Sequence, residues 1–378
     1  MSEISSWQVV DGIALLTLNN PPVNAISAAV RRAIIDGIAR TNNDANVDAL
    51  VIACAGRTFF PGADLKEFGK PPIEPFLTEV VDVIEASNKA VVAAIHGTAL
   101  GGGLEIAMAC HWRVAVTSAK LGLPEVKLAL MPGARGTQYL PRLVGVERAL
   151  EIIALGDPIS AHTAADIGLI DELATDGLIP TAINFARHIA GRQPRRTRDM
   201  EAAPVEDEIY DRFIAKHARK FKGYDAPTAI VDSIRAATQL QFDEGAKKER
   251  EIFLKLREGP QNAAMRHVFF AERQAAKLPE LEGIEPRNIA STGVIGAGTM
   301  GSGIAIALLS AGLPVTLYER NSKALNCGVT KIKSAIEGNL RSGRTSRDKA
   351  NKALASLSTT VDIDRLAQAD LVIEYILS

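Results

Sequence analysis

The sequence is poor in cysteine, and this bounds where the protein works. Its 378 residues include three cysteines, Cys54, Cys110 and Cys327. Because they are odd in number and far apart, they argue against a disulfide framework and against a CxxC metal or redox site. The pattern predicts a protein of a reducing, intracellular compartment.

Neither sign of charge is in excess. The chain has 43 Lys and Arg residues and 44 Asp and Glu residues, so its formal net charge is −1. No global field therefore attracts it to nucleic acid or to an anionic lipid surface, and we expect neither as a partner. Any anion that it binds must be held by a local site.

No segment has the pattern of a secretory signal or of a membrane span. Glu3 stands before the first apolar run, where a signal peptide carries basic residues. Residues 90–110 are long enough to cross a bilayer, but His96, three consecutive glycines and Glu105 interrupt them. We expect a buried strand, a tight turn and a buried helix in this segment.

The length suggests two or three domains, since a domain has roughly 150 residues and a single core stops growing at roughly 250–300 residues. Residues 1–190 alternate strand and helix patterns, which predicts an α/β core. Composition changes at Gly191, and we expect a helical subdomain and linker helix over 191–286. A second α/β unit is predicted over 287–378.

Hydrophobic periodicity predicts the elements in more detail. One amphipathic helix is expected over 269–278, with its aromatic residues on the buried side. The other expected elements are strands at 14–18, 49–53, 91–95, 112–116 and 314–318, and helices at 28–39, 104–110 and 147–155.

Two glutamates, Glu105 and Glu125, stand in apolar sequence. Desolvation raises the pKa of a carboxyl group, so such a pair can exchange protons near neutral pH. The glycines at 101–103 let the backbone approach a ligand, and the N-terminus of the following helix would face it, as in an oxyanion pocket for a thioester enolate. The alternative is that each Glu is ion-paired or solvated and that the glycines form only a turn.

The sequence around these glutamates is similar to that of a known family. VVAAIHGTALGGGLEIAMACHWRVA, followed by KLGLPEVKLALMPGARGTQYLPRLVG, closely resembles the crotonase (enoyl-CoA hydratase/isomerase) superfamily, and in particular the hydratase half of the multifunctional enzymes of fatty-acid β-oxidation. The resemblance covers residues 4–173. It implies a ClpP/crotonase-like fold, a β-β-α spiral of the α/β class.

The resemblance also implies roles for individual residues. Glu105 corresponds to the glutamate that activates water, and Glu125 to the one that exchanges the proton at the α-carbon. The backbone N–H groups of Ala63 and Gly102 correspond to the oxyanion hole. Gly62 and Asp64, which flank Ala63, are expected to contact substrate.

Anionic groups need local cations in a chain of near-zero net charge. Lys66, Arg273 and Lys277 are therefore candidates to bind the phosphates of coenzyme A. The alternative is that all three are solvated surface residues.

A glycine motif, Gly296-x-Gly298-x-x-Gly301, follows a strand-like run and opens an Ala- and Ile-rich helix. Glu319 ends the next predicted strand about 20 residues on, where an acid accepts from the ribose hydroxyls of NAD and repels the 2′-phosphate of NADP. The alternative is a glycine-rich helix cap, with Glu319 paired to Arg320 or Lys323. The residues expected to bind NAD are Gly296, Gly298, Thr299, Met300, Gly301 and Glu319.

This last segment resembles the N-terminal part of the NAD domain of 3-hydroxyacyl-CoA dehydrogenases, and MRHVFFAERQAAKLPEL at 265–281 resembles the linker helix of the same multifunctional enzymes. The family's catalytic His, its Glu partner and its substrate-side Ser and Asn lie further along. Nothing in 296–378 can stand in for them. We therefore expect a truncated gene product with a partial Rossmann NAD-binding domain.

The resemblance implies an enoyl-CoA hydratase that acts on acyl-CoA thioesters in β-oxidation, with Δ3,Δ2-enoyl-CoA isomerization as a second reaction. NAD, at a partial site, and coenzyme A, as part of the substrate, are the expected cofactors. No metal is expected, because His96, Cys110 and His111 lack ligand spacing. The alternative function is a non-catalytic acyl-CoA- and NAD-binding subunit that assembles with a thiolase. The expected location is the cytoplasm of a bacterium, or the peroxisome for a full-length eukaryotic relative.

Overall fold

The computed structural model divides into two compact units, Met1–Lys277 and Leu278–Ser378. The residues that the structure describes are 4–64, 67, 71, 73–275, 278–281, 283–341 and 344–375. No helix among them is long and apolar enough to span a bilayer.

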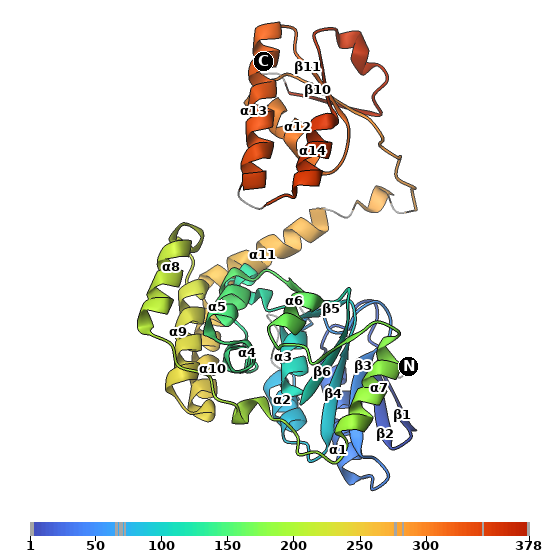
Figure 1. The fold of residues 1–378 in the computed structure, drawn as a ribbon, viewed down its shortest axis with the longest axis vertical. Coiled ribbons are helices and arrows are strands. Elements are labelled where there is room, and N and C mark those ends of the chain that lie inside the picture. The colour runs from blue at the N-terminus through green and yellow to red at the C-terminus, as the bar shows by residue number, and fades with distance from the viewer. Residues whose placement is uncertain are drawn as a thin grey trace. The chain divides into compact units, whose positions relative to one another are not determined.

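The first unit is built on a six-stranded sheet of order β1-β2-β3-β4-β6-β9 (Figure 1). Only the edge strand β1 is antiparallel to its neighbour. Every residue of β3 and β4 is buried, as expected for parallel strands covered on both faces. The strands are β1 (Ser5–Val10), β2 (Ile13–Leu18), β3 (Ala49–Cys54), β4 (Ala90–Ile95), β6 (Trp112–Val116) and β9 (Glu172–Ala174).

Successive residues of β2 point to opposite faces of this sheet. Leu16 packs in a core shared with α1 (Ala28–Asn43), α2 (Leu77–Glu85) and α3 (Gly102–Ala109), whereas Leu15 packs in a core shared with α7 (Leu178–Ile189). The sheet is therefore the central layer between two sets of helices.

A second, three-stranded sheet consists of β5 (Thr98–Leu100), β7 (Lys120–Gly122) and β8 (Ile159–Ser160). β5 and β7 are parallel, with Leu100 opposite Gly122. The segments that follow these strands therefore leave the same edge of the sheet. One is α3, which carries Glu105, and the other is the 3-10 helix η2 (Pro124–Leu128), which carries Glu125.

The remaining helices of the first unit pack on one another, and those after residue 190 contribute to the same large core as the residues before it. Tyr210, Phe221, Ile230 and Phe242 lie in the same apolar cluster as strands β2 and β3. The unit thus extends across the boundary predicted after residue 190, since α9 packs on α4 and α5, α10 packs on α4, and α8 packs on α9. The helices are α4 (Gly136–Val144), α5 (Val146–Leu155), α6 (Ala161–Asp166), η3 (Thr197–Asp199), α8 (Asp207–Phe221), α9 (Ala226–Gln239), α10 (Phe242–Glu258) and α11 (Pro260–Ala275).

The aromatic residues of α11 are not on a buried face, so this part of the sequence prediction is wrong. Phe270 is 41% exposed and Phe269 is only half-buried. Asn262 is the one buried residue of the helix, and its side-chain amide donates to the carbonyl of Leu128 at 2.8 Å. The first turns of α11 therefore pack on η2, whereas Phe269 and Phe270, further along the helix, are left partly or largely exposed.

The second unit has a parallel sheet of order β12-β11-β10-β13. The strand order reverses direction at β10, and the turn after β10 begins α12. This is the position at which doubly wound sheets bind ligands. Its elements are η4 (Pro279–Leu281), β10 (Thr292–Ile295), α12 (Thr299–Ser310), β11 (Val315–Tyr318), α13 (Ser322–Arg341), α14 (Arg347–Ala355), β12 (Leu357–Thr360), η5 (Ile363–Leu366) and β13 (Leu371–Glu374).

Candidate active site

Glu105 lies in the first turn of α3 and is 2% exposed. The helix begins at Gly102, two residues before the predicted start, because Gly101 (φ 53°) makes the turn into it. Glu105 Oε1 accepts from the N–H groups of Ala134, at 2.7 Å, and Gly136, at 2.9 Å. These two donors favour the charged carboxylate and hold one of its oxygens in place.

Glu125 lies in η2 and faces the same turn. A Cβ added at Gly101 would lie 2.9 Å from Glu125 Oε1, so only a glycine leaves room for the carboxyl group there. The other oxygen, Oε2, is buried and has no hydrogen-bond partner among the described residues. An unpartnered buried carboxyl oxygen favours the protonated form.

Burial is the main cause that raises the pKa of both groups. Burial, with a smaller contribution from the negative charge of Glu249, raises the pKa of Glu125 to about 8. Burial also raises the pKa of Glu105, and the negative charges of Glu125 and Glu249 raise it by smaller amounts. Both carboxyl groups can therefore exchange protons near neutral pH, and the contacts above favour the charged form at Glu105 and the protonated form at Glu125.

The backbone nitrogen of Ala63 lies close to Gly102. A Cβ added at Gly102 would be 3.9 Å from the nitrogen of Ala63. The loop at Gly62 (φ 130°) is held by a hydrogen bond from the N–H of Ile26 to the carbonyl of Gly62 at 3.0 Å. No described residue accepts from either N–H group, so both remain candidates to donate to an oxyanion.

The other expected substrate contacts are placed less directly. Asp64 follows Ala63, and its N–H lies 3.4 Å from the carbonyl of Ile26. Arg273 is on the last turns of α11, where its guanidinium stacks on Phe269 at 4.0 Å from the ring centroid. Lys66 and Lys277 lie outside the described residues. A role for these cations at the phosphates of coenzyme A stays a prediction.

The glycine motif of the second unit and Glu319 are brought together. Gly296 (φ 99°) turns the chain after β10, and a Cβ at Gly301 would lie 1.8 Å from the carbonyl oxygen of Gly296. Glu319, at the end of β11, accepts from the N–H of Ala297 at 3.2 Å. Gly298 has nothing within 4 Å of a Cβ position, which leaves space for a diphosphate at the N-terminus of α12. Thr299 and Met300, on the first turn of this helix, are exposed.

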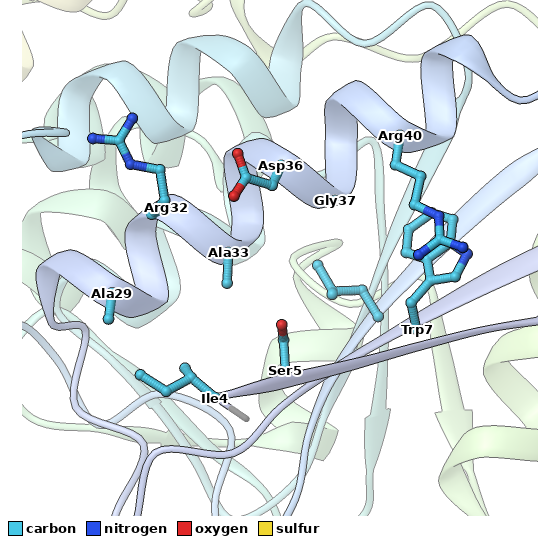
Figure 2. A pocket seen from close by; sticks show the side chains of 10 residues that line it. Ile4, Ser5, Trp7, Ala29, Arg32, Ala33, Asp36, Gly37 and Arg40 are labelled. Atoms are coloured by element: carbon cyan, nitrogen blue, oxygen red, sulfur yellow. The ribbon is translucent and has the colours of Figure 1, made fainter. Parts of the chain in front are cut away.

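A hollow of about 350 Å³ lies elsewhere, between the edge strand β1 and α1. Trp7 and Arg40 stack at one end of it, and Ser5 and Asp36 face it in Figure 2. Neither Glu105 nor Glu125 lines it. It is therefore separate from the carboxylate pair.

Sequence reasoning missed Glu249 of α10, a carboxylate that is 0% exposed. Its Oε1 accepts from the N–H of Arg135 at 2.7 Å, and its Oε2 accepts from the N–H and hydroxyl of Thr137 at 2.9 and 2.5 Å. A signal was present, because Glu249 follows Phe242 and Ala246 at helical spacing on the apolar face of α10. A charge on such a face needs buried partners.

Comparison with known families identifies both units. A model described as enoyl-CoA hydratase/isomerase matches residues 8–224. A second, described as 3-hydroxyacyl-CoA dehydrogenase, NAD binding domain, matches residues 291–378.

Among similar proteins, the peroxisomal bifunctional enzyme of Danio rerio is 39% identical over 374 residues, covering 96% of this chain and 51% of that protein. The peroxisomal fatty acid beta-oxidation multifunctional protein of Arabidopsis thaliana is 35% identical, covering 97% and 53%. The chain thus spans about half the length of these relatives. An enoyl-CoA hydratase/isomerase from Pseudoalteromonas atlantica, 22% identical, superposes with a TM-score of 0.54 over 71% of this chain and 97% of that one, which supports the fold.

Proposed function

Because the chain belongs to the enoyl-CoA hydratase/isomerase family, we propose that its first unit adds water across the double bond of a 2-enoyl-CoA thioester. One observation carries the proposal. Two carboxyl groups with raised pKa values lie at the turn that carries Gly102, next to backbone N–H groups that no described residue accepts from. Proton exchange and oxyanion stabilisation are the two tasks that this reaction sets.

Each group has one task in the proposed mechanism. The N–H groups of Ala63 and Gly102 donate to the thioester oxygen, which makes the β-carbon electrophilic and stabilises the enolate. Glu105, charged and held by its two donors, removes a proton from water as the water oxygen bonds to the β-carbon. Glu125 delivers its proton to the α-carbon. The pair ends with its one proton on Glu105, and transfer of that proton to solvent or back to Glu125 restores the starting state.

Steady-state hydration of crotonyl-CoA tests the proposal. We expect turnover by the chain and loss of turnover in the double variant Glu105→Gln/Glu125→Gln. The variant Glu251→Gln, an exposed residue of α10, is the matched control for loss of one carboxylate. A folded chain that binds crotonyl-CoA but does not hydrate it would contradict the proposal and favour the non-catalytic binding subunit, for which assembly with a thiolase is the next test.

Isomerization of a 3-enoyl-CoA is a second reaction that the same pair supports. It needs one carboxylate to take a proton at C2 or C4 and to return it at the other carbon. Assaying 3-hexenoyl-CoA for conjugation of its double bond tests this activity. Loss of the activity in Glu125→Gln would support its assignment to the same pair of carboxyl groups.

The second unit fits NAD at the turn after β10. Gly301 allows α12 to pack against that turn, Gly298 leaves space for the diphosphate, and Glu319 lies where the adenosine ribose is bound in such folds. NAD supplies a hydride acceptor when it is bound. A dehydrogenase step on 3-hydroxyacyl-CoA in the whole protein follows from the relatives' names, as does a peroxisomal location, and both are parts of this proposal.

A further inference from the structure

Two carboxylates share one turn of the chain, residues 134–137. Glu105 accepts from the N–H groups of Ala134 and Gly136, and Glu249 accepts from those of Arg135 and Thr137. The four consecutive N–H groups thus alternate between the two acids. Neither carboxylate can shift without moving the turn that holds the other.

Both oxygens of Glu249 face donors. The hydroxyl of Thr137, which also contacts the hydroxyl of Ser233 at 2.7 Å, is the third of these donors. Glu249 is 0% exposed, so an uncompensated change of its contacts is costly. Burial raises the pKa of Glu249, and this set of donors opposes that rise and favours the charged carboxylate. The same contacts link α9 and α10 to the turn that orients Glu105.

From this arrangement we infer that Glu249 is a positioning residue for the carboxylate pair. It fixes the turn that aims Glu105 at water, and its charge makes the pair retain its proton to higher pH. The inference rests on the hydratase activity proposed above, but it concerns a residue that touches no reacting atom.

The charges around Glu249 agree with this role. Its negative charge raises the pKa of both Glu105 and Glu125. The nearby cations only partly offset it, since Arg135 also pairs with Asp82 at 3.1 Å. The charged groups that face Glu249 from the packed elements are Glu105 on α3, Glu125 on η2, Arg135 before α4, and Arg250 beside it on α10.

Kinetics of Glu249→Gln provide the main test. Gln keeps the shape but puts an NH₂ group opposite an N–H donor and removes the charge. We expect kcat for crotonyl-CoA to fall about 10- to 100-fold, the scale of a misplaced catalytic group, with KM little changed. The alkaline limb of the pH–rate profile should move to lower pH, because a like charge beside the pair is lost. Glu251→Gln on the same helix should change neither.

Thr137→Val is the second variant, in case Glu249→Gln does not fold. It removes one donor to Glu249 and keeps the backbone N–H groups, so a smaller fall in kcat and a shift of the alkaline limb in the same direction are expected. A folded Glu249→Gln or Thr137→Val protein with wild-type kcat and an unmoved alkaline limb would overturn the inference. So would a fall in kcat without a shift of that limb, which a merely structural role predicts.

Hydrogen exchange of the amides of residues 134–137 separates this inference from the proposed function. Glu249→Gln should speed their exchange, whereas Glu251→Gln should not. If the wild-type chain hydrates nothing, the proposed function fails, and the exchange rates still decide whether Glu249 holds the turn. Unchanged exchange in Glu249→Gln would overturn its positioning role.

Discussion

In the first unit Glu105 is 2% exposed, and the turn that holds it is itself held by Glu249, 112 residues beyond Thr137. In the second unit the glycine turn is held by Glu319, 22 residues beyond Ala297, and the first residues of α12 are exposed. The difference follows from chemistry. A carboxyl group that exchanges protons near neutral pH needs desolvation, which takes many distant residues. Backbone N–H groups that bind a diphosphate need only a local turn open to solvent.

The largest effect expected from this comparison is on the first unit alone. Glu105→Gln or Glu125→Gln removes one proton-transfer group while keeping its shape, so each should lower the rate of crotonyl-CoA hydration by roughly 10²–10⁴-fold. NAD affinity of the second unit should not change. Near-wild-type turnover in both single variants would contradict the mechanism.

A smaller effect is expected at the oxyanion hole. Gly102→Val places a branched side chain beside the N–H of Ala63 and against Leu77, whose Cδ2 would lie 2.7 Å from the new Cβ. Loss of one oxyanion donor costs about 3 kcal/mol in transition-state stabilisation. The hydration rate should fall in Gly102→Ala and fall further in Gly102→Val. Circular dichroism of each variant checks that it is folded. Unchanged rates in both would place the oxyanion elsewhere.

The next experiment changes the second unit and leaves the first unit unaltered. Gly301→Ala puts a Cβ 1.8 Å from the carbonyl oxygen of Gly296, whereas Gly303→Ala, on the same helix, meets nothing within 4 Å. We expect NAD affinity, measured by calorimetric titration, to fall about tenfold or more in Gly301→Ala, which corresponds to about 1.4 kcal/mol. Gly303→Ala is the control. Hydration of crotonyl-CoA should be the same in all three proteins, and equal NAD affinities would contradict the assignment of the turn.

A further effect is a pH dependence that only the buried site should show. Hydration should slow above about pH 8 as Glu125 loses its proton. The folded state holds this proton more tightly than the unfolded chain, so the stability that it contributes is present below the ordinary pKa of 4.5 and is lost as the pH rises towards about 8.

Glu125→Gln removes this dependence. Its free energy of unfolding, measured in urea, should exceed that of the wild type by on the order of 1–3 kcal/mol at pH 9, and the difference should shrink towards pH 4.5. Glu251→Gln should show no such trend. An equal stability difference at both pH values would mean that burial does not raise the pKa of Glu125.

Much of the site could be predicted from short stretches of sequence. The glycines at 101–103, Glu105 and Glu125 are read from two segments, and β5 and β7 bring those segments to one edge of a sheet. The strand expected at 112–116 is confirmed as Trp112–Val116, and the helix expected at 28–39 extends to Asn43. The periodicity of apolar side chains and the backbone conformations that require glycine are local properties, so they can be read directly from the sequence.

Other features depend on contacts between residues that are far apart in the sequence. The residues of α8–α10 look like a separate helical region in sequence, but α9 packs on α4 and α5, α10 packs on α4, and their apolar residues join the same core. Phe270 reads as a core residue and is exposed. The sequence by itself determined the two carboxyl groups and the two glycine turns, because each depends on a few neighbouring residues. The tertiary structure alone decided that Glu249 shares a turn with Glu105, because a buried charge is satisfied by whichever donors the packing of distant helices brings to it.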